Sequence, residues 1–184
     1  MSKFDKIIGY SAVKKELKQI ADTLKNREVY AKLGVASPRG LLLYGEPGVG
    51  KSLMASAVIE ESGRKAFVCR KDQPNGDFVK VIKATFEKAI ENAPSIVLLD
   101  DMDKFANGDE HYPDAEEYVT VQSCIDEAKG KEVFVLATVN NMRCFTICFN
   151  SLSLKFSAIP KSSSNIFSPE KEAVLTKSEG STLS

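Results

Sequence analysis

A short glycine-rich segment carries the residues of this sequence that are best suited to chemistry. Residues 45–52 read Gly-Glu-Pro-Gly-Val-Gly-Lys-Ser and match the pattern G-x-x-x-x-G-K-[ST] at every fixed position. Glycines let the backbone bend so that several N–H groups point at one anion. The lysine adds a positive charge, and the hydroxyl that follows adds a metal ligand. The pattern therefore predicts a phosphate-binding loop.

The segments on either side of this loop are those that such a loop requires. Residues 41–44 are apolar and predict a buried strand, and residues 53–61 predict a helix that follows directly. The positive end of this helix strengthens the field that holds a phosphate. The alternative, a glycine-rich turn with a chance lysine, does not account for the agreement between the loop and both flanking elements.

The loop assigns roles to the residues around a nucleotide phosphate. We expect Lys51 to contact the β- and γ-phosphates as a point charge and to support catalysis, and the Ser52 hydroxyl to bind Mg²⁺. The nucleotide-binding residues that we predict in and beside the loop are Gly45, Glu46, Pro47, Gly48, Val49, Gly50, Lys51, Ser52 and Leu53.

A second motif supplies paired carboxylates. An apolar strand predicted at residues 95–100 closes with Asp100 and is followed by Asp101. We predict that Asp100 binds the same Mg²⁺ as Ser52, and that Asp101 orients or deprotonates the water that attacks the γ-phosphate. A buried strand that ends in a solvated acidic turn is the alternative, and the phosphate-binding loop upstream disfavours it.

Asn140 stands just beyond the strand predicted at residues 133–138. Its amide is suited to a hydrogen bond with the γ-phosphate or with the attacking water, so we include it among the catalytic residues. Asn-Asn pairs are common in loops, and a structural turn is therefore the alternative to this role.

The order of predicted elements indicates the architecture that positions these side chains. Strands predicted at 41–44, 65–69, 95–100 and 133–138 alternate with helices predicted at 12–25, 53–61, 78–92 and 115–128. Such alternation predicts an α/β fold with a parallel sheet of about four strands between two helical layers, the three-layer αβα arrangement of a P-loop NTPase. Ligands bind at the carboxyl ends of the strands in such folds.

Composition sets limits on partners and location. The 25 basic and 25 acidic residues cancel, so charge gives no indication of a nucleic-acid partner. We expect no membrane span and no secretory signal, and hence a cytoplasmic location. Cys144 and Cys148 are four residues apart, but His111 is the only histidine and lies far from them in sequence. Reduced structural thiols are therefore favoured over a zinc site.

With these motifs in place, the sequence resembles the AAA ATPase family, and within it the ATPase module of FtsH-type proteases. The resemblance covers about residues 4–141 and rests on residues 4–9, 13–24, 30–34, 38–52, 99–101 and 137–140. It implies ATP and Mg²⁺ as cofactors, ATP hydrolysis, assembly with other AAA subunits into a ring that is usually hexameric, and remodelling of a protein substrate that the sequence does not identify. It also implies that Ile7 and Ile8 contact the adenine.

The sequence departs from the family pattern at several points. The family has glutamate where Asp101 stands, and an aromatic pore loop where residues 70–76 contain no aromatic residue. Arginine fingers, the last strand of the sheet and a helical lid domain are expected after Asn140 and are not evident. A shorter catalytic carboxylate and missing fingers each slow hydrolysis, so we expect impaired ATP hydrolysis by this chain alone.

These observations divide the chain into two parts. We interpret residues 1–143 as the AAA core and residues 144–184 as a low-complexity tail, disordered or aberrant, because residues 151–184 contain ten serines in 34 positions. The leading prediction is an Mg-ATP-binding AAA ATPase. The alternative is a subunit that binds ATP without hydrolysing it and regulates an AAA assembly. An unrelated P-loop kinase or GTPase is disfavoured because no Asn-Lys-x-Asp guanine motif is present.

Overall fold

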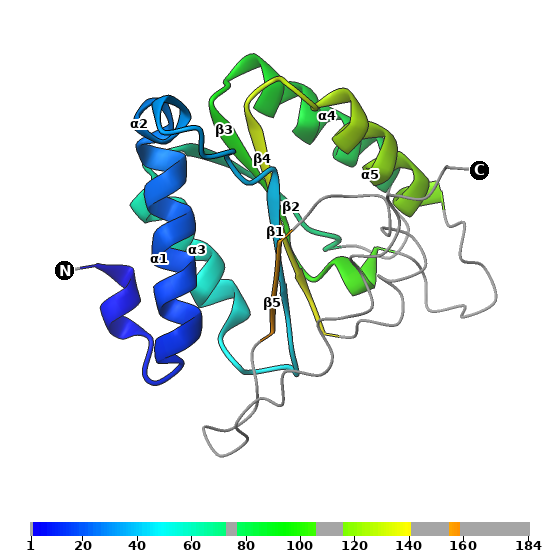
Figure 1. Cartoon of the computed structure of the whole chain (residues 1–184). Helices are drawn as coiled ribbons and strands as arrows, with labels where there is room; N and C mark the ends of the chain where they lie inside the picture. The colour runs from blue at the N-terminus through cyan, green and yellow to red at the C-terminus, as the bar shows by residue number, and fades with distance from the viewer. Residues whose placement is uncertain (1, 73–76, 106–115, 141–154, 159–184) are drawn as a thin grey trace, which may run out of the picture.

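A parallel β-sheet forms the centre of the structure, with helices on both of its faces (Figure 1). The structure is a computed structural model that describes residues 2–72, 77–105, 116–140 and 155–158. Neighbouring strands follow the order β2-β3-β4-β1-β5, and every pair is parallel. The strands are β1 (Gly40–Tyr44), β2 (Lys65–Cys69), β3 (Ser95–Leu99), β4 (Val133–Val139) and β5 (Lys155–Ala158).

Helices α1 and α3 cover one face of the sheet, and α4 and α5 cover the other (Figure 1). The helical elements are η1 (Lys3–Lys6), α1 (Ser11–Lys25), α2 (Arg27–Lys32), α3 (Lys51–Ser62), α4 (Phe78–Glu91), η2 (Met102–Lys104) and α5 (Glu116–Glu127). The α/β class, the parallel sheet and the helical layers confirm the fold predicted from the sequence. Among the described residues, no helix has the length and apolarity to cross a lipid bilayer.

The central strands are apolar along their whole length because both of their faces are buried. Successive residues of β1 point to opposite sides, so Leu41 and Leu43 pack in the core beneath α1 and α3, whereas Leu42 packs beneath α4 and α5. All three are 0% exposed. This burial on both sides fixes β1 in position, and with it the loop that follows Tyr44.

The register of the strands brings the predicted motifs to one edge of the sheet. Leu43 of β1 pairs with Thr138 of β4, and Ala137 of β4 pairs with Leu99 of β3. The phosphate-binding loop, Asp100 and Asn140 each follow one of these three strands. They therefore emerge side by side at the carboxyl edge.

One expectation about the fold is wrong. The sequence led us to expect a sheet without its last strand, but β5 pairs in parallel with β1 from Leu41↔Lys155 to Tyr44↔Ala158. The prediction failed because a four-residue strand inside a serine-rich segment carries too little apolar pattern to be recognised. The boundary at residue 143, most of the predicted tail, the absence of a lid, Cys144, Cys148 and His111 lie outside the described residues.

Candidate active site

The loop between β1 and α3 has the backbone conformation that its glycines permit. Gly48 and Gly50 have φ angles of +85° and +90°, in a region that residues with a side chain rarely adopt. A left-handed residue at Gly50 turns the chain directly into α3, whose first residue is Lys51. The loop and the positive end of a helix therefore lie together, as an anion site requires.

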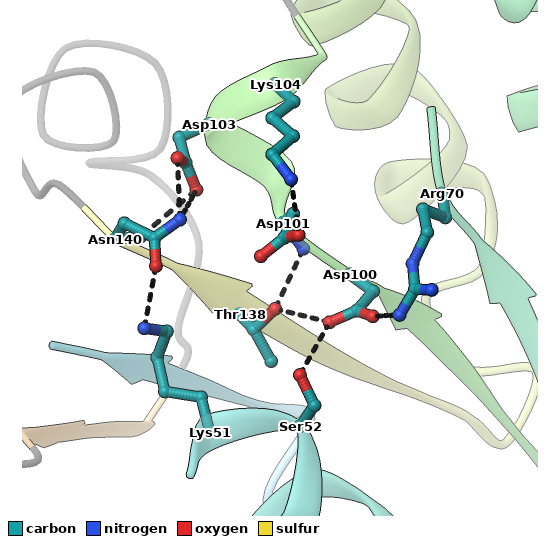
Figure 2. A network of polar contacts seen from close by, with 9 residues as sticks. All are labelled: Lys51, Ser52, Arg70, Asp100, Asp101, Asp103, Lys104, Thr138 and Asn140. Atoms are coloured by element: carbon teal, nitrogen blue, oxygen red, sulfur yellow. Dashed lines mark hydrogen bonds and ion pairs between the residues drawn. The ribbon is translucent and has the colours of Figure 1, made fainter. Parts of the chain in front are cut away.

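Lys51 points back across the loop and all three of its ammonium donors are in use (Figure 2). Its Nζ donates to the backbone oxygens of Gly45 at 2.8 Å and Glu46 at 2.9 Å, and to Oδ1 of Asn140 at 2.8 Å. The side chain is buried, and this burial lowers the pKa of Lys51, although Asp101 and other nearby carboxylates oppose the shift. The ammonium is thus held beside the loop by three uncharged oxygens.

Asp100 is a buried carboxylate at the end of β3, with a residue exposure of 2%. Its Oδ1 accepts hydrogen bonds from Thr138 Oγ1 at 2.8 Å and Ser52 Oγ at 3.5 Å, and its Oδ2 is paired with the Arg70 guanidinium. Burial raises the pKa of Asp100, but the bonds from Arg70, Thr138 and Ser52 outweigh it, so the pKa lies below the ordinary value. The carboxylate is therefore ionised at neutral pH.

Asp101 occupies a strained position directly after Asp100. Its φ is +52°, in the left-handed region, and its backbone N–H donates to Thr138 Oγ1 at 2.9 Å. Its side chain is turned to Lys104, whose Nζ donates to Oδ2 at 2.8 Å. The residue predicted to orient water thus lies beside the carboxylate predicted to bind metal, and is engaged in an ion pair within its own turn.

Asn140 links the lysine to a third aspartate. Its side-chain amide donates to Asp103 Oδ2 at 2.9 Å, and its backbone N–H donates to Asp103 Oδ1 at 3.0 Å. Its amide oxygen accepts the bond from Lys51 (Figure 2). Asp103 therefore sets the orientation of the amide, with oxygen toward Lys51 and nitrogen toward the carboxylate.

The remaining residues predicted to contact the nucleotide differ in exposure. Ile7 is buried in the core with a residue exposure of 5%, whereas Ile8 is 92% exposed, so the two residues proposed to touch adenine have different surroundings. Leu53 on α3 is 40% exposed, and Val49 packs partly against the core.

The structure adds four residues that the sequence analysis did not single out. Thr138 bridges Asp100 and Asp101, Arg70 pairs with Asp100, Asp103 holds Asn140, and Lys104 pairs with Asp101. Each stands within five residues of the carboxyl end of a parallel strand. Inspection of every polar residue at those ends would have found them, because in such folds ligands bind there.

The donor set around Ser52 and Asp100 fits Mg²⁺. A hydroxyl and a carboxylate are the hard oxygen ligands that this ion takes from protein when phosphate oxygens and water complete its shell. Among the described residues, no group of three or more histidine, cysteine, aspartate or glutamate side chains is arranged to hold a metal ion by itself. The pair Ser52 and Asp100 therefore suits a metal whose shell a nucleotide phosphate and water complete.

Comparison with known proteins agrees with this geometry. Residues 41–151 match the model of the ATPase family associated with various cellular activities (AAA). An ATP-dependent zinc metalloprotease FtsH from Leptotrichia buccalis is 37% identical over 150 residues, which are 75% of this chain and 20% of that protein. The Mycoplasma pneumoniae protein of the same name is 42% identical over 105 residues, 55% of this chain and 15% of that protein.

A plant relative extends the same finding. The chloroplastic ATP-dependent zinc metalloprotease FTSH 5 of Arabidopsis thaliana is 40% identical over 104 residues, which are 54% of this chain and 15% of that protein. The chain spans a fifth or less of the length of these three curated relatives. The family match covers more than half of the sequence and falls on the strands and loops that build the site. The chain belongs to the AAA family of ATPases and is a module of the type found in FtsH proteins.

Proposed function

We propose that this chain binds Mg-ATP at the carboxyl edge of its sheet and hydrolyses it slowly when it is alone. The observation that carries the proposal is the convergence of Lys51, Ser52, Asp100 and Asn140 at one end of the sheet, where Lys51 is bonded to Asn140 and Ser52 to Asp100. These residues come from three strand ends and lie up to 89 positions apart in sequence. Their assembly is what a nucleotide phosphate and its metal need.

When the nucleotide binds, Lys51 exchanges its hydrogen-bond partners in the protein for phosphate oxygens. Lys51 releases the two loop carbonyls and turns its ammonium to the β- and γ-phosphate oxygens, which are far stronger acceptors. Ser52 and Asp100 would hold Mg²⁺, which when bound supplies charge neutralisation on the phosphates. The loop N–H groups and the start of α3 complete the anion site.

Slow hydrolysis follows from the state of Asp101. A carboxylate that orients water must reach it, yet Asp101 has a short side chain and is paired with Lys104 at 2.8 Å. A displacement of about 1 Å from the productive position can cost on the order of a hundredfold in rate. The same observation favours a second candidate function, an ATP-binding subunit without hydrolysis that regulates an assembly of AAA subunits.

Calorimetric titration with Mg-ATP tests the proposal. The wild-type chain should bind, and Lys51→Ala should lower the affinity at least a hundredfold, since it removes a charge-assisted contact to two phosphates. Lys80→Ala is the matched control, because Lys80 is an exposed lysine paired only with Asp77 among the contacts described. Loss of affinity in both variants, or in neither, would contradict the proposal.

Turnover separates the two candidate functions. Phosphate release by the wild-type chain below the usual enzyme range of about 1 s⁻¹, but above the background set by Lys51→Ala, supports a slow ATPase. Binding with no release above that background supports the regulatory subunit. Addition of the chain to a competent AAA ring, with the ring's own turnover as the readout, then tests the regulatory role directly.

A further inference from the structure

Arg70 stands at the carboxyl end of β2, next to the proposed metal site. Cys69 pairs with Leu99 in the register of β2 and β3, and the Asp100 N–H donates to the Cys69 oxygen at 3.0 Å. The residues that follow, Arg70 and Asp100, therefore leave two neighbouring strands side by side. Figure 2 shows the Arg70 side chain running from the strand edge to the Asp100 carboxylate, on the side opposite Thr138.

The pair joins a buried anion to a half-exposed cation. The side chain of Asp100 is 2% exposed, whereas that of Arg70 is 50% exposed. An uncompensated buried carboxylate is costly, and Arg70 is the cation that contacts this one among the described residues. Arginine does not lose its charge at any ordinary pH, so it can leave Asp100 only by moving away. Its exposed half lets it do so without rearrangement of the sheet.

Arg70 binds the same carboxylate, that of Asp100, that we propose binds Mg²⁺. Oδ1 of Asp100 is already bonded to Thr138 and lies toward Ser52, so Oδ2 is the oxygen that Arg70 holds. A divalent ion beside Ser52 would lie close to the guanidinium, and like charges at short distance inside a protein repel strongly. Occupation of Asp100 by one cation therefore disfavours occupation by the other.

We propose that Arg70 is a tethered counter-ion which balances Asp100 before nucleotide binds and competes with Mg²⁺ for it, so that metal loading requires displacement of Arg70. This inference rests on the proposed function, because it concerns the metal of the same site. Arg70 would then determine how strongly nucleotide affinity depends on Mg²⁺. In wild-type protein the arginine lets nucleotide bind without metal, since it offsets the negative charge of Asp100 next to the phosphates.

The test compares ADP affinity in EDTA with ADP affinity in Mg²⁺, by calorimetry on the full chain. Arg70→Gln should weaken ADP binding in EDTA and leave it equal or tighter in Mg²⁺. The dissociation constant in EDTA divided by that in Mg²⁺ should therefore be about tenfold larger for Arg70→Gln than for wild type. Tenfold is the lower end of what one charge-assisted bond is worth. Arg70→Lys keeps the charge and should stay within about threefold of wild type. Arg39→Gln, which changes an exposed arginine at the amino end of β1, is the matched control and should leave the ratio unchanged.

A second measurement uses the unaltered chain, in case Arg70→Gln does not fold. Phenylglyoxal modifies accessible guanidinium groups, and mass spectrometry reports the rate at each arginine. With ADP present, Mg²⁺ should raise the labelling rate of Arg70 several-fold relative to EDTA, with Arg39 as the internal reference. ADP binding with an unchanged affinity ratio, or an unchanged labelling rate, would overturn the role of Arg70 and leave the proposed function standing. If wild type binds ADP neither in EDTA nor in Mg²⁺, both the role of Arg70 and the proposed function are overturned.

Discussion

Replacement of Thr138 by valine should destabilise the fold far more than its small change in volume suggests. The Thr138 side chain is 0% exposed, and its hydroxyl makes two bonds, donating to Asp100 Oδ1 at 2.8 Å and accepting from the Asp101 N–H at 2.9 Å. Valine has the same shape but removes both of these bonds. A bond to a charged group contributes about 1.5–3 kcal/mol and one between neutral groups about 0.5–1.5 kcal/mol, so the free energy of unfolding should fall by about 2–4 kcal/mol.

Urea denaturation followed by circular dichroism measures this change. Thr85→Val is the matched control, because the Thr85 hydroxyl is also largely buried but its partners are neutral: it donates to the Val81 carbonyl of its own helix at 2.7 Å and lies beside the Cys69 thiol. A helical carbonyl keeps its usual backbone donor when such a bond is lost, so the control should cost less than about 1 kcal/mol. If Thr138→Val costs no more than Thr85→Val, the Thr138 hydroxyl does not stabilise the Asp100 carboxylate and the Asp101 N–H.

The same comparison has a predicted pH dependence. Burial raises the pKa of Asp100, yet its partners, Thr138 among them, leave the pKa below its ordinary value. A carboxylate with a lowered pKa contributes stability above the pKa of the unfolded chain, near pH 4, and loses that contribution as the pH falls through the folded value. The difference between wild type and Thr138→Val should therefore be full at pH 7 and shrink below about pH 4.

Three other perturbations test separate parts of the site. Lys51→Met should abolish nucleotide binding in calorimetry yet leave the thermal midpoint unchanged or raised, because burial of the ammonium is unfavourable, as its lowered pKa indicates; a large fall in the midpoint would contradict this. Asp101→Glu should raise the rate of phosphate release at least tenfold, since a longer carboxylate reaches the water, whereas Asp101→Asn should abolish release. Asp103→Ala should free the Asn140 amide and weaken ATP binding by several-fold, with no change expected for Asp77→Ala, which removes an exposed aspartate.

The sequence was sufficient for most of the sheet because these strands have a strong local signal. Residues 65–69 were predicted as a strand and form β2 with the same bounds, and the predicted strands at 41–44, 95–100 and 133–138 differ from β1, β3 and β4 by one residue at one end. Each is an apolar run bounded by polar or turn residues, which is what burial on both faces demands. Helix α2 was not predicted, because its six residues are too few to show helical periodicity.

The sequence was less informative about the site, because the motif residues are local but their partners are not. The phosphate-binding loop and Asp100 were recognised from short patterns, while Arg70 and Asp103 became visible only through strand register. The motif also did not reveal that Asn140 presents its oxygen to Lys51 and its nitrogen to Asp103. That orientation depends on a carboxylate 37 residues away, and no spacing rule contains it.

The strand that the sequence analysis missed has a consequence for the loop. With β5 paired to β1, the strand that leads into the phosphate-binding loop has neighbours on both sides, β4 and β5. Without β5, β1 would be an edge strand with unpaired N–H and C=O groups, and a loop anchored to it would be less firmly held. Pairing from Leu41↔Lys155 to Tyr44↔Ala158 covers nearly the whole of β1.

A proline scan across β5 tests this pairing without removal of any part of the chain. In a parallel pair, the N–H groups of alternate residues point to the partner strand, so proline at positions 155–158 should affect stability with a period of two. At the two positions whose N–H points to β1, proline should lower the free energy of unfolding by about 1–3 kcal/mol and weaken ATP binding. At the two positions whose N–H points away from β1, it should do neither. Urea denaturation and calorimetry on the four variants give both readouts. Equal effects at all four positions would mean that proline acts through chain stiffness and not through the ladder to β1.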